Sequence, residues 1–345
     1  MKRVSGLAMM AILAVVAATG VSCSAQATTP DPSHIGMGVH MMFDDAASID
    51  RQFDLMEQMN VTTVRIDFDW SAIEPEPGQY NWSYQDRIVE QAAARGMQIL
   101  ALLTYTPNWA RPPGTTSHVP PDREEDFATF AQAAATRYAP RGVHSWEIWN
   151  EPNTSDFWLP LPDVDRYGAL FLAAAEAIRQ VDGNATVITG GLTRGTDTAD
   201  GHRISQLTFL TGLYRNGAAQ VADAIAVHPY SFPVLPSASD PDVVGGFADL
   251  PQLHALMRRE GDADKKIWIT EFGAPTGTAP EAMSDREQAE SLLEARRMAG
   301  DWDWAGPLIF YELRDSGTDP AELEQNFGVV RVDLSLKDAG KALMK

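Results

Sequence analysis

The stretch Ser145-Trp146-Glu147-Ile148-Trp149-Asn150-Glu151-Pro152 decides the fold class, because it ends a short strand-like run in a glutamate followed by proline. A second stretch, Ile267-Trp268-Ile269-Thr270-Glu271-Phe272-Gly273, has a glutamate at the same point, just before a glycine. Aromatic and β-branched residues favour strands, whereas Pro and Gly mark where strands end. We therefore expect both carboxylates at the mouths of strands rather than on a solvated helix face.

Outward from these stretches, short strand-like runs alternate with segments of helical spacing, such as the stripe Ile49, Phe53 and Met56. An apolar period of 3.6 between short apolar runs predicts strand–helix units and a parallel sheet. The strand-like runs are Ile35–His40, Thr63–Trp70, Gln98–Tyr105, Ser145–Trp149, Thr186–Gly190, Ala224–Tyr230, Ile267–Glu271 and Pro307–Glu312.

Eight such runs in one domain-sized chain predict an α/β fold of the (β/α)8 TIM-barrel type, as a single domain over residues 28–345. A doubly wound sheet is the rival, and it places ligand chemistry at one switch point. Here polar and aromatic residues end many different runs, and only a barrel brings those ends together. These residues are His40, Arg65, Tyr105, Glu151, His228, Tyr230, Glu271 and Tyr311.

The first 27 residues have the pattern of a secretory signal peptide. Lys2 and Arg3 precede an apolar run from Leu7 to Val21, and Ala25-Gln26-Ala27 is a small-x-small cleavage signal. We expect export and a mature chain that starts at Thr28. The alternative is a lipid anchor at Cys23, the one cysteine of the chain, because Gly20-Val21-Ser22-Cys23 is similar to a lipobox.

The net charge is −20, from 27 Lys and Arg against 47 Asp and Glu. An acidic surface repels phosphate backbones and anionic lipid, so nucleic acid is not an expected partner. Apart from the leader, no transmembrane segment is expected. The sequence leaves the oligomeric state open.

Several motifs resemble those of the clan A glycoside hydrolases. Trp149-Asn150-Glu151-Pro152-Asn153 is similar to the clan's motif at the fourth strand, and Thr270-Glu271-Phe272-Gly273 to its motif at the seventh. The resemblance extends from about His34 to the C-terminus and includes His228-Pro229-Tyr230. Within the clan it is nearest to family 39, with the cellulase-like family 5 next.

The resemblance implies roles for the two glutamates, Glu151 as the acid/base and Glu271 as the nucleophile of a retaining glycosidase. Glycosidic cleavage needs one group to protonate the leaving oxygen and another to attack the anomeric carbon. Asn150 resembles the clan asparagine that binds the sugar 2-hydroxyl. Arg65 is the expected cation beside Glu271, and Tyr230 an expected donor to the same carboxylate.

The expected substrate-binding residues also include aromatic and histidine side chains near strand ends. Indole and phenol rings are suitable platforms for the C–H faces of sugars. Many clan members have a tryptophan at the end of strand eight, where this chain has Phe310-Tyr311, so Tyr311 or Phe310 must take its place. His228 has two open interpretations, a substrate contact or a packed rim residue. The full set is Asn150, Arg65, His228, Tyr230, His40, Trp109, Trp158 and Tyr311.

Several other carboxylates stand near the predicted strand ends or in the loops between strands. Glu147 shares strand parity with Glu151 and is expected in a buried network, where it needs a cation or hydrogen bonds. Glu74 and Glu76 flank prolines in a loop and are expected to be solvated. We expect Asp67, Asp69 and Asp315 at the rim of the site or behind it.

No cofactor or metal is expected, because no His, Asp or Glu group has ligand spacing. The sequence thus predicts a secreted retaining glycoside hydrolase for a β-linked poly- or oligosaccharide. One alternative is a non-catalytic glycan-binding protein on the same scaffold, which has no need of two such carboxylates. Another is an aldolase-like barrel, which needs a lysine at a strand end, whereas Lys265 and Lys266 stand at a strand start.

Overall fold

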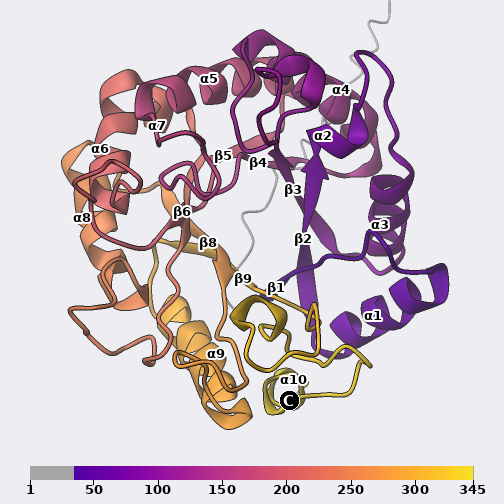
Figure 1. The fold of residues 1–345 in the computed structure, drawn as a ribbon, viewed down its shortest axis with the longest axis vertical. Coiled ribbons are helices and arrows are strands. Elements are labelled where there is room, and N and C mark those ends of the chain that lie inside the picture. The colour runs from indigo at the N-terminus through magenta and orange to yellow at the C-terminus, as the bar shows by residue number, and fades with distance from the viewer. Residues whose placement is uncertain (1–34, 345) are drawn as a thin grey trace, which may run out of the picture.

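A computed structural model describes residues 35–344, and these form a closed parallel barrel surrounded by helices (Figure 1). Neighbouring strands pair in parallel all around the ring, and the pair Ile188 and Ala224 closes it between β5 and β7. A two-residue strand, β6 (Leu192–Thr193), also pairs in parallel with β7, near its C-terminal end. The barrel strands are β1 (Ile35–Gly38), β2 (Val61–Asp69), β3 (Gln98–Thr104), β4 (Ser145–Ile148), β5 (Thr186–Thr189), β7 (Ala224–His228), β8 (Lys266–Phe272) and β9 (Ala305–Phe310).

The helices lie outside the barrel, and several of them begin at a side chain that accepts hydrogen bonds from free backbone N–H groups. Asp45, Asp163, Ser205 and Ser284 are such caps. The helices are α1 (Ala46–Gln58), α2 (Trp70–Ile73), α3 (Ser83–Ala94), α4 (Glu124–Tyr138), α5 (Val164–Val181), α6 (Gln206–Asn216), α7 (Ala218–Val221), α8 (Leu250–Arg259), α9 (Asp285–Gly300) and α10 (Asp338–Leu343), with 3-10 turns η1 (Asn108–Ala110), η2 (Ala139–Arg141), η3 (Phe247–Asp249) and η4 (Leu323–Gln325).

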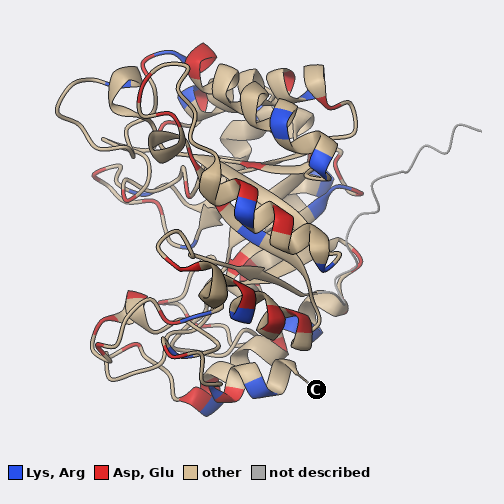
Figure 2. Ribbon diagram, turned by 90° about the vertical axis from the view of Figure 1, so that its right-hand side faces the viewer, with Lys and Arg blue, Asp and Glu red and all other residues tan. Residues whose placement is uncertain are grey.

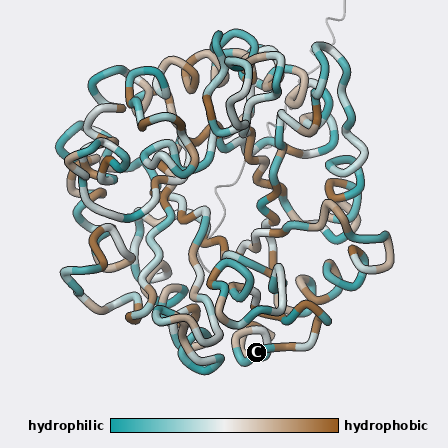
Figure 3. The backbone as a smooth tube through the Cα atoms, in the orientation of Figure 1, coloured by the Kyte–Doolittle hydropathy of each residue, from teal (hydrophilic) through white to brown (hydrophobic). Residues whose placement is uncertain are grey.

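The main core lies between the strands and the helices, where the predicted stripe Ile49, Phe53 and Met56 is buried. The strands are the most apolar part of the tube in Figure 3, whereas charged residues of both signs occupy the outer helices and loops in Figure 2. A second, small apolar cluster fills the barrel interior, so the barrel is a packed core rather than a pore. Its members are Leu100, Ile188, Ala224, Ala226, Trp268 and Ile309.

The prediction of a single-domain TIM barrel is confirmed. Three predicted runs extend two residues past the observed strand ends, because β1 ends at Gly38, β7 at His228 and β9 at Phe310, and four others extend one residue past them. Beyond β1 and β7, His40 and Tyr230 carry their side chains into the barrel mouth. The predicted signal peptide and Cys23 lie outside the described residues.

Within residues 35–344, no helix is both long enough and apolar enough to cross a membrane.

Candidate active site

A cavity of about 320 Å³ opens at the C-terminal ends of the strands. That volume is at the lower end of the range typical for small-molecule sites. Seven predicted residues line it: His40, Arg65, Asn150, Glu151, Tyr230, Glu271 and Tyr311. The other lining residues are Asp67, Leu102, Tyr105, Asp156, Phe157, Thr193, Arg194, Phe232, Glu324 and Phe327.

Glu151 reaches this cavity through an unusual backbone turn after β4. Trp149 and Glu151 have φ values of 69° and 43°, in the left-handed region that costs a non-glycine residue free energy. The fully buried Trp149 indole donates to the carbonyl of Phe157 at 2.9 Å, and Glu151 N donates to Gly191 O at 3.1 Å. The turn is thus held from both sides, and the strain points the carboxylate of Glu151 into the barrel mouth.

Arg65 connects three acceptors at the bottom of the cavity. Its Nε donates to Glu147 Oε2 at 2.7 Å, its Nη1 to Glu271 Oε1 at 2.5 Å and its Nη2 to Asn150 Oδ1 at 3.1 Å. The planar guanidinium suits such multiple contacts, and its charge is always present. Arg65 therefore fixes the nearby carboxylate and amide in one arrangement.

Glu147 is fully buried beneath the cavity, as the strand parity predicted. Besides Arg65, it accepts hydrogen bonds from Thr270 Oγ1 and from Gly191 N, both at 2.9 Å. A buried carboxylate is tolerated when it is paired and hydrogen-bonded in this way. Glu147 is thus a fixed negative charge that orients Arg65 and Thr270.

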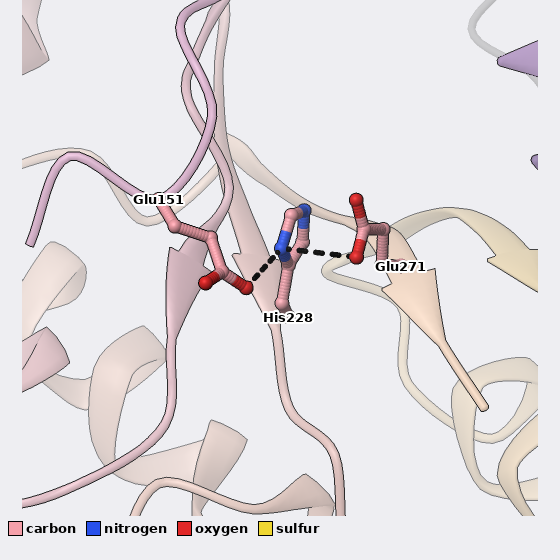
Figure 4. Close-up of side chains that lie close together, drawn as sticks. All are labelled: Glu151, His228 and Glu271. Atoms are coloured by element: carbon pink, nitrogen blue, oxygen red, sulfur yellow. Dashed lines mark hydrogen bonds and ion pairs between the residues drawn. The ribbon is translucent and has the colours of Figure 1, made fainter. Parts of the chain in front are cut away.

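His228 lies between the two candidate catalytic glutamates (Figure 4). Its Nδ1 is 2.8 Å from Glu151 Oε1 and 3.5 Å from Glu271 Oε2, whereas its Nε2 is 3.0 Å from Thr270 Oγ1. The single proton of the Thr270 hydroxyl is donated to Glu147, so Nε2 must donate to that hydroxyl. In the neutral imidazole, Nδ1 is then an acceptor that faces Glu151.

The fit of His228 depends on the glycine at position 191. A Cβ atom on that residue would lie 2.0 Å from Nε2 of His228. The neighbouring Gly190 would likewise place a Cβ 2.4 Å from the carbonyl oxygen of Trp149. The pair of glycines after β5 therefore makes room for the imidazole and for the strained turn.

The pKa values of the two glutamates move in opposite directions. Burial raises the pKa of Glu151 above its ordinary value, and the nearby charge of Glu271 adds to that, although His228 opposes both. Burial would also raise the pKa of Glu271, but His228, Arg65 and the hydroxyl of Tyr230 outweigh it and leave the pKa lowered. The Tyr230 contact is 2.7 Å long. One carboxyl is thus disposed to hold a proton and the other to stay ionised.

The two carboxylates and His228 form a compact group. One oxygen of each glutamate and one ring nitrogen of His228 all lie within 4.8 Å of one another. These three side chains are the candidates for metal ligands among the described residues. The contacts of His228 with Glu151 and Glu271 affect its pKa. Burial alone would lower that pKa, but the two glutamates outweigh burial and leave it raised. The pKa of Glu151 is thus raised by burial and by Glu271, and the pKa of His228 by the two glutamates.

His40 and Tyr311 lie on the side of the cavity formed by β1 and β9. His40 is 46% exposed, and its Nδ1 is 2.8 Å from Glu312 Oε2. Its ring packs edge-on against Tyr311 at a centroid distance of 5.8 Å. Tyr311 therefore occupies the place at the end of the last strand for which the sequence predicted it.

Three expectations need correction. Trp158 is 1% exposed and packs between Trp149 and Tyr167, so it supports the turn and does not face the cavity. Trp109 also lies outside the cavity lining, and its indole donates to the carbonyl of Glu74. Glu74, expected to be solvated, is 4% exposed because its carboxylate accepts from Trp70 Nε1 and Gly78 N, each at 2.6 Å.

Sequence reasoning missed several lining residues, among them Arg194 and Phe327. Arg194 follows β6 and donates to the carbonyls of Tyr230 and Phe232. Phe327 packs edge-on against Tyr311 at 5.3 Å. Both stand in loops without apolar periodicity, so no local pattern could have identified them.

The comparisons with solved structures support the fold. A family 39 glycoside hydrolase from the gut symbiont Bacteroides cellulosilyticus WH2 has a TM-score of 0.73 at 24% identity, over 92% of this chain and 63% of that one. A monomeric β-xylosidase from Caulobacter crescentus CB15 has a TM-score of 0.67 at 17% identity, over 92% and 69%. The exo-β-1,4-mannosidase Op5Man5 from Opitutaceae bacterium strain TAV5 has a TM-score of 0.61 at 19% identity, over 92% and 58%.

This chain thus spans about six tenths of the length of the first of these structures. No curated protein matches the sequence. The model of the cellulase family, glycosyl hydrolase family 5, matches residues 24–305, which is most of the chain. The sequence motifs resembled families 39 and 5 of one clan, and both appear among these findings. The chain therefore belongs to the cellulase family, glycosyl hydrolase family 5, a family of clan A glycosidases.

Proposed function

We propose that this protein is a retaining glycoside hydrolase in which Glu271 attacks the anomeric carbon and Glu151 is the acid/base. The proposal is carried by two neighbouring carboxylates whose pKa values shift in opposite directions and which bring one oxygen each within 4.8 Å of the other. Retaining enzymes have their carboxyl groups about 5–5.5 Å apart, and inverting enzymes about 6.5–9.5 Å. The approach of one oxygen of Glu151 to one oxygen of Glu271 within 4.8 Å supports the shorter, retaining separation.

In the first step, Glu271 bonds to the anomeric carbon while Glu151 gives its proton to the leaving oxygen. Arg65 and Tyr230 keep Glu271 ionised and aimed, because each donates to a different oxygen of that carboxylate. In the second step, Glu151 removes a proton from water, which then attacks the glycosyl-enzyme. His228 contacts Glu151 at 2.8 Å and fixes the position of its carboxyl group during both steps.

The substrate is a β-linked oligo- or polysaccharide. The support is the family, together with the named activities of the similar structures, a β-xylosidase and an exo-β-1,4-mannosidase. The leader pattern over residues 1–27 supports export, with a lipid anchor at Cys23 as the alternative form. A glycan-binding protein without activity has no use for a protonated and an ionised carboxyl side by side.

A screen of the purified protein on polysaccharides and aryl β-glycosides tests the proposal. We expect hydrolysis of at least one β-glycoside, with the first product in the β configuration when it is followed by proton NMR. A first product of α configuration would overturn the retaining mechanism. Glycan binding without cleavage across the whole panel would favour the binding protein.

A further inference from the structure

One side of the carboxylate pair is already filled. His228, at the end of β7, contacts both Glu151 and Glu271, and Tyr230 contacts Glu271 from the loop that follows the same strand. Figure 4 shows the imidazole between the two carboxylates. A sugar ring with its anomeric carbon beside Glu271 must therefore lie on the opposite side, toward β9, β1, β2 and β3. The cavity residues on that side are His40, Asp67, Tyr105 and Tyr311.

Asp67 lies next to the position that this sugar would occupy. Arg65 and Asp67 are two residues apart on β2, so their side chains share one face of the strand. Arg65 already contacts Glu271, which places Asp67 one step nearer the barrel mouth. Asp67 lines the cavity, and its side chain is 30% exposed.

The acceptor capacity of Asp67 is unused. Within residues 35–344, no hydrogen bond reaches its carboxylate, and the nearest cationic atom is His40 Nε2 at 3.8 Å. Glu147 and Glu271, by contrast, have donors on both oxygens. An ionised carboxylate offers about four lone-pair sites, and sugar hydroxyls are suitable donors for them. His40 is itself held by Glu312 and so stays beside Asp67.

We propose that Asp67 determines glycone specificity by accepting hydrogen bonds from hydroxyl groups of the sugar that Glu271 attacks. This inference rests on the proposed function. Its substrate class is a glycone that is neutral on the side facing Asp67. A uronic acid that places its carboxylate there would meet Asp67 in a cavity that Glu324, another carboxylate, also lines. Like charges at short range in a partly desolvated site repel each other strongly.

The test uses the aryl β-glycoside that the wild type hydrolyses best, its monodeoxy analogues and the matching aryl uronide. The kcat/KM of each substrate is measured for the wild type, Asp67→Ala, Asp67→Asn and Asp156→Asn. Asp156 is the matched control, because it lines the cavity on the β4 side. Asp67→Asn keeps the size of the side chain, and circular dichroism checks the fold of each variant.

We expect Asp67→Ala to lower kcat/KM on the parent glycoside about 10- to 100-fold, the usual effect of losing hydrogen bonds to a charged group. On one or two deoxy analogues the same substitution should cost less than 3-fold, because the lost hydroxyl and the lost carboxylate are partners. Asp67→Asn should raise the rate on the uronide relative to the parent. Asp156→Asn should show no such coupling to any glycone hydroxyl.

Equal losses from Asp67→Ala on the parent and on every deoxy analogue would overturn the inference and leave the glycosidase intact. A folded wild type that cleaves neither a polysaccharide nor an aryl glycoside would overturn the proposed function, and this inference with it.

Discussion

Nδ1 of His228 lies 2.8 Å from Oε1 of Glu151, so a single proton serves both side chains. The pKa of each is raised, in Glu151 chiefly by burial and in His228 by the two glutamates against the opposing effect of burial. Because such a pair titrates together, its apparent pKa values belong to the pair. The pair can therefore hold the proton that a glycosidase gives to its leaving group.

The pH dependence of kcat/KM on a glycan substrate follows from the two glutamates. Activity requires ionised Glu271, whose lowered pKa places the acidic limb below the range of an ordinary carboxyl. It also requires protonated Glu151, whose raised pKa places the alkaline limb above that range. In Glu151→Gln, the alkaline limb should vanish when a dinitrophenyl glycoside makes the proton unnecessary. An unchanged alkaline limb in that variant would assign it to another group.

Thr270→Val tests whether the tautomer of His228 controls the pKa of Glu151. The hydroxyl of Thr270 makes Nε2 of His228 a donor and leaves Nδ1 as acceptor for Glu151. Without it, Nδ1–H can donate to ionised Glu151, so the alkaline limb should move to lower pH. The control is Thr104→Val, whose buried hydroxyl has no hydrogen bond within the described chain. Identical pH profiles for both variants would contradict this role of Thr270.

Gly191→Ala tests the close approach of the imidazole. The new Cβ would lie 2.0 Å from Nε2, so His228 must move, and a shift of about 1 Å in a positioned group costs on the order of 100-fold in rate. The control Gly183→Ala adds a Cβ with nothing within 4 Å and should keep full activity. Steady-state kinetics on an aryl glycoside measures both, and wild-type kcat/KM in Gly191→Ala would show that the position of His228 does not matter.

The buried pair Lys337 and Asp315 is expected to stabilise the C-terminal part of the fold. Lys337 is 2% exposed and donates to Asp315 Oδ1 at 2.7 Å, to Thr276 Oγ1 and to Asn326 O. Asp315→Ala leaves a buried cation without its partner, which should lower the free energy of unfolding by about 3–5 kcal/mol.

Urea unfolding checks this expectation. Lys341→Met, which removes an exposed pair with Asp338, should change the free energy of unfolding by less than about 1 kcal/mol. Equal effects of the two substitutions would mean that the buried pair contributes no more than a surface pair.

The alternation of strands and helices and the two glutamates at strand ends were sufficient to predict the barrel and its mouth. Glu151 and Glu271 follow β-type runs. The C-terminal ends of parallel barrel strands meet on one face, irrespective of the conformation of the loops. Glu147 could also be predicted, because the period of two along β4 points it inward. These features depend on local periodicity, which the sequence shows directly.

The remaining features depend on contacts between distant segments. His228 touches Glu151 and Thr270, which stand 77 and 42 positions away, so its role could not be read from its neighbours. Trp158 and Tyr311 both follow strands, yet only Tyr311 faces the cavity. Glu74 is buried because a loop folds its carboxylate back onto Trp70. Loop conformations of this kind leave no periodic pattern of apolar residues in the sequence, so they could not be predicted from it.

Azide rescue of the two glutamate variants tests the central claim most directly. Glu151→Ala should lose glycan hydrolysis but still form the glycosyl-enzyme from an activated aryl β-glycoside, because a good leaving group needs no proton. Azide then displaces Glu271, and the product should be a glycosyl azide of retained, β configuration. In Glu271→Gly, azide takes the place of the nucleophile and should give the α-azide. The configuration of each azide is measured by proton NMR. A β-azide from Glu151→Ala and an α-azide from Glu271→Gly would bear out the account, whereas the reverse pair would exchange the two roles and contradict it.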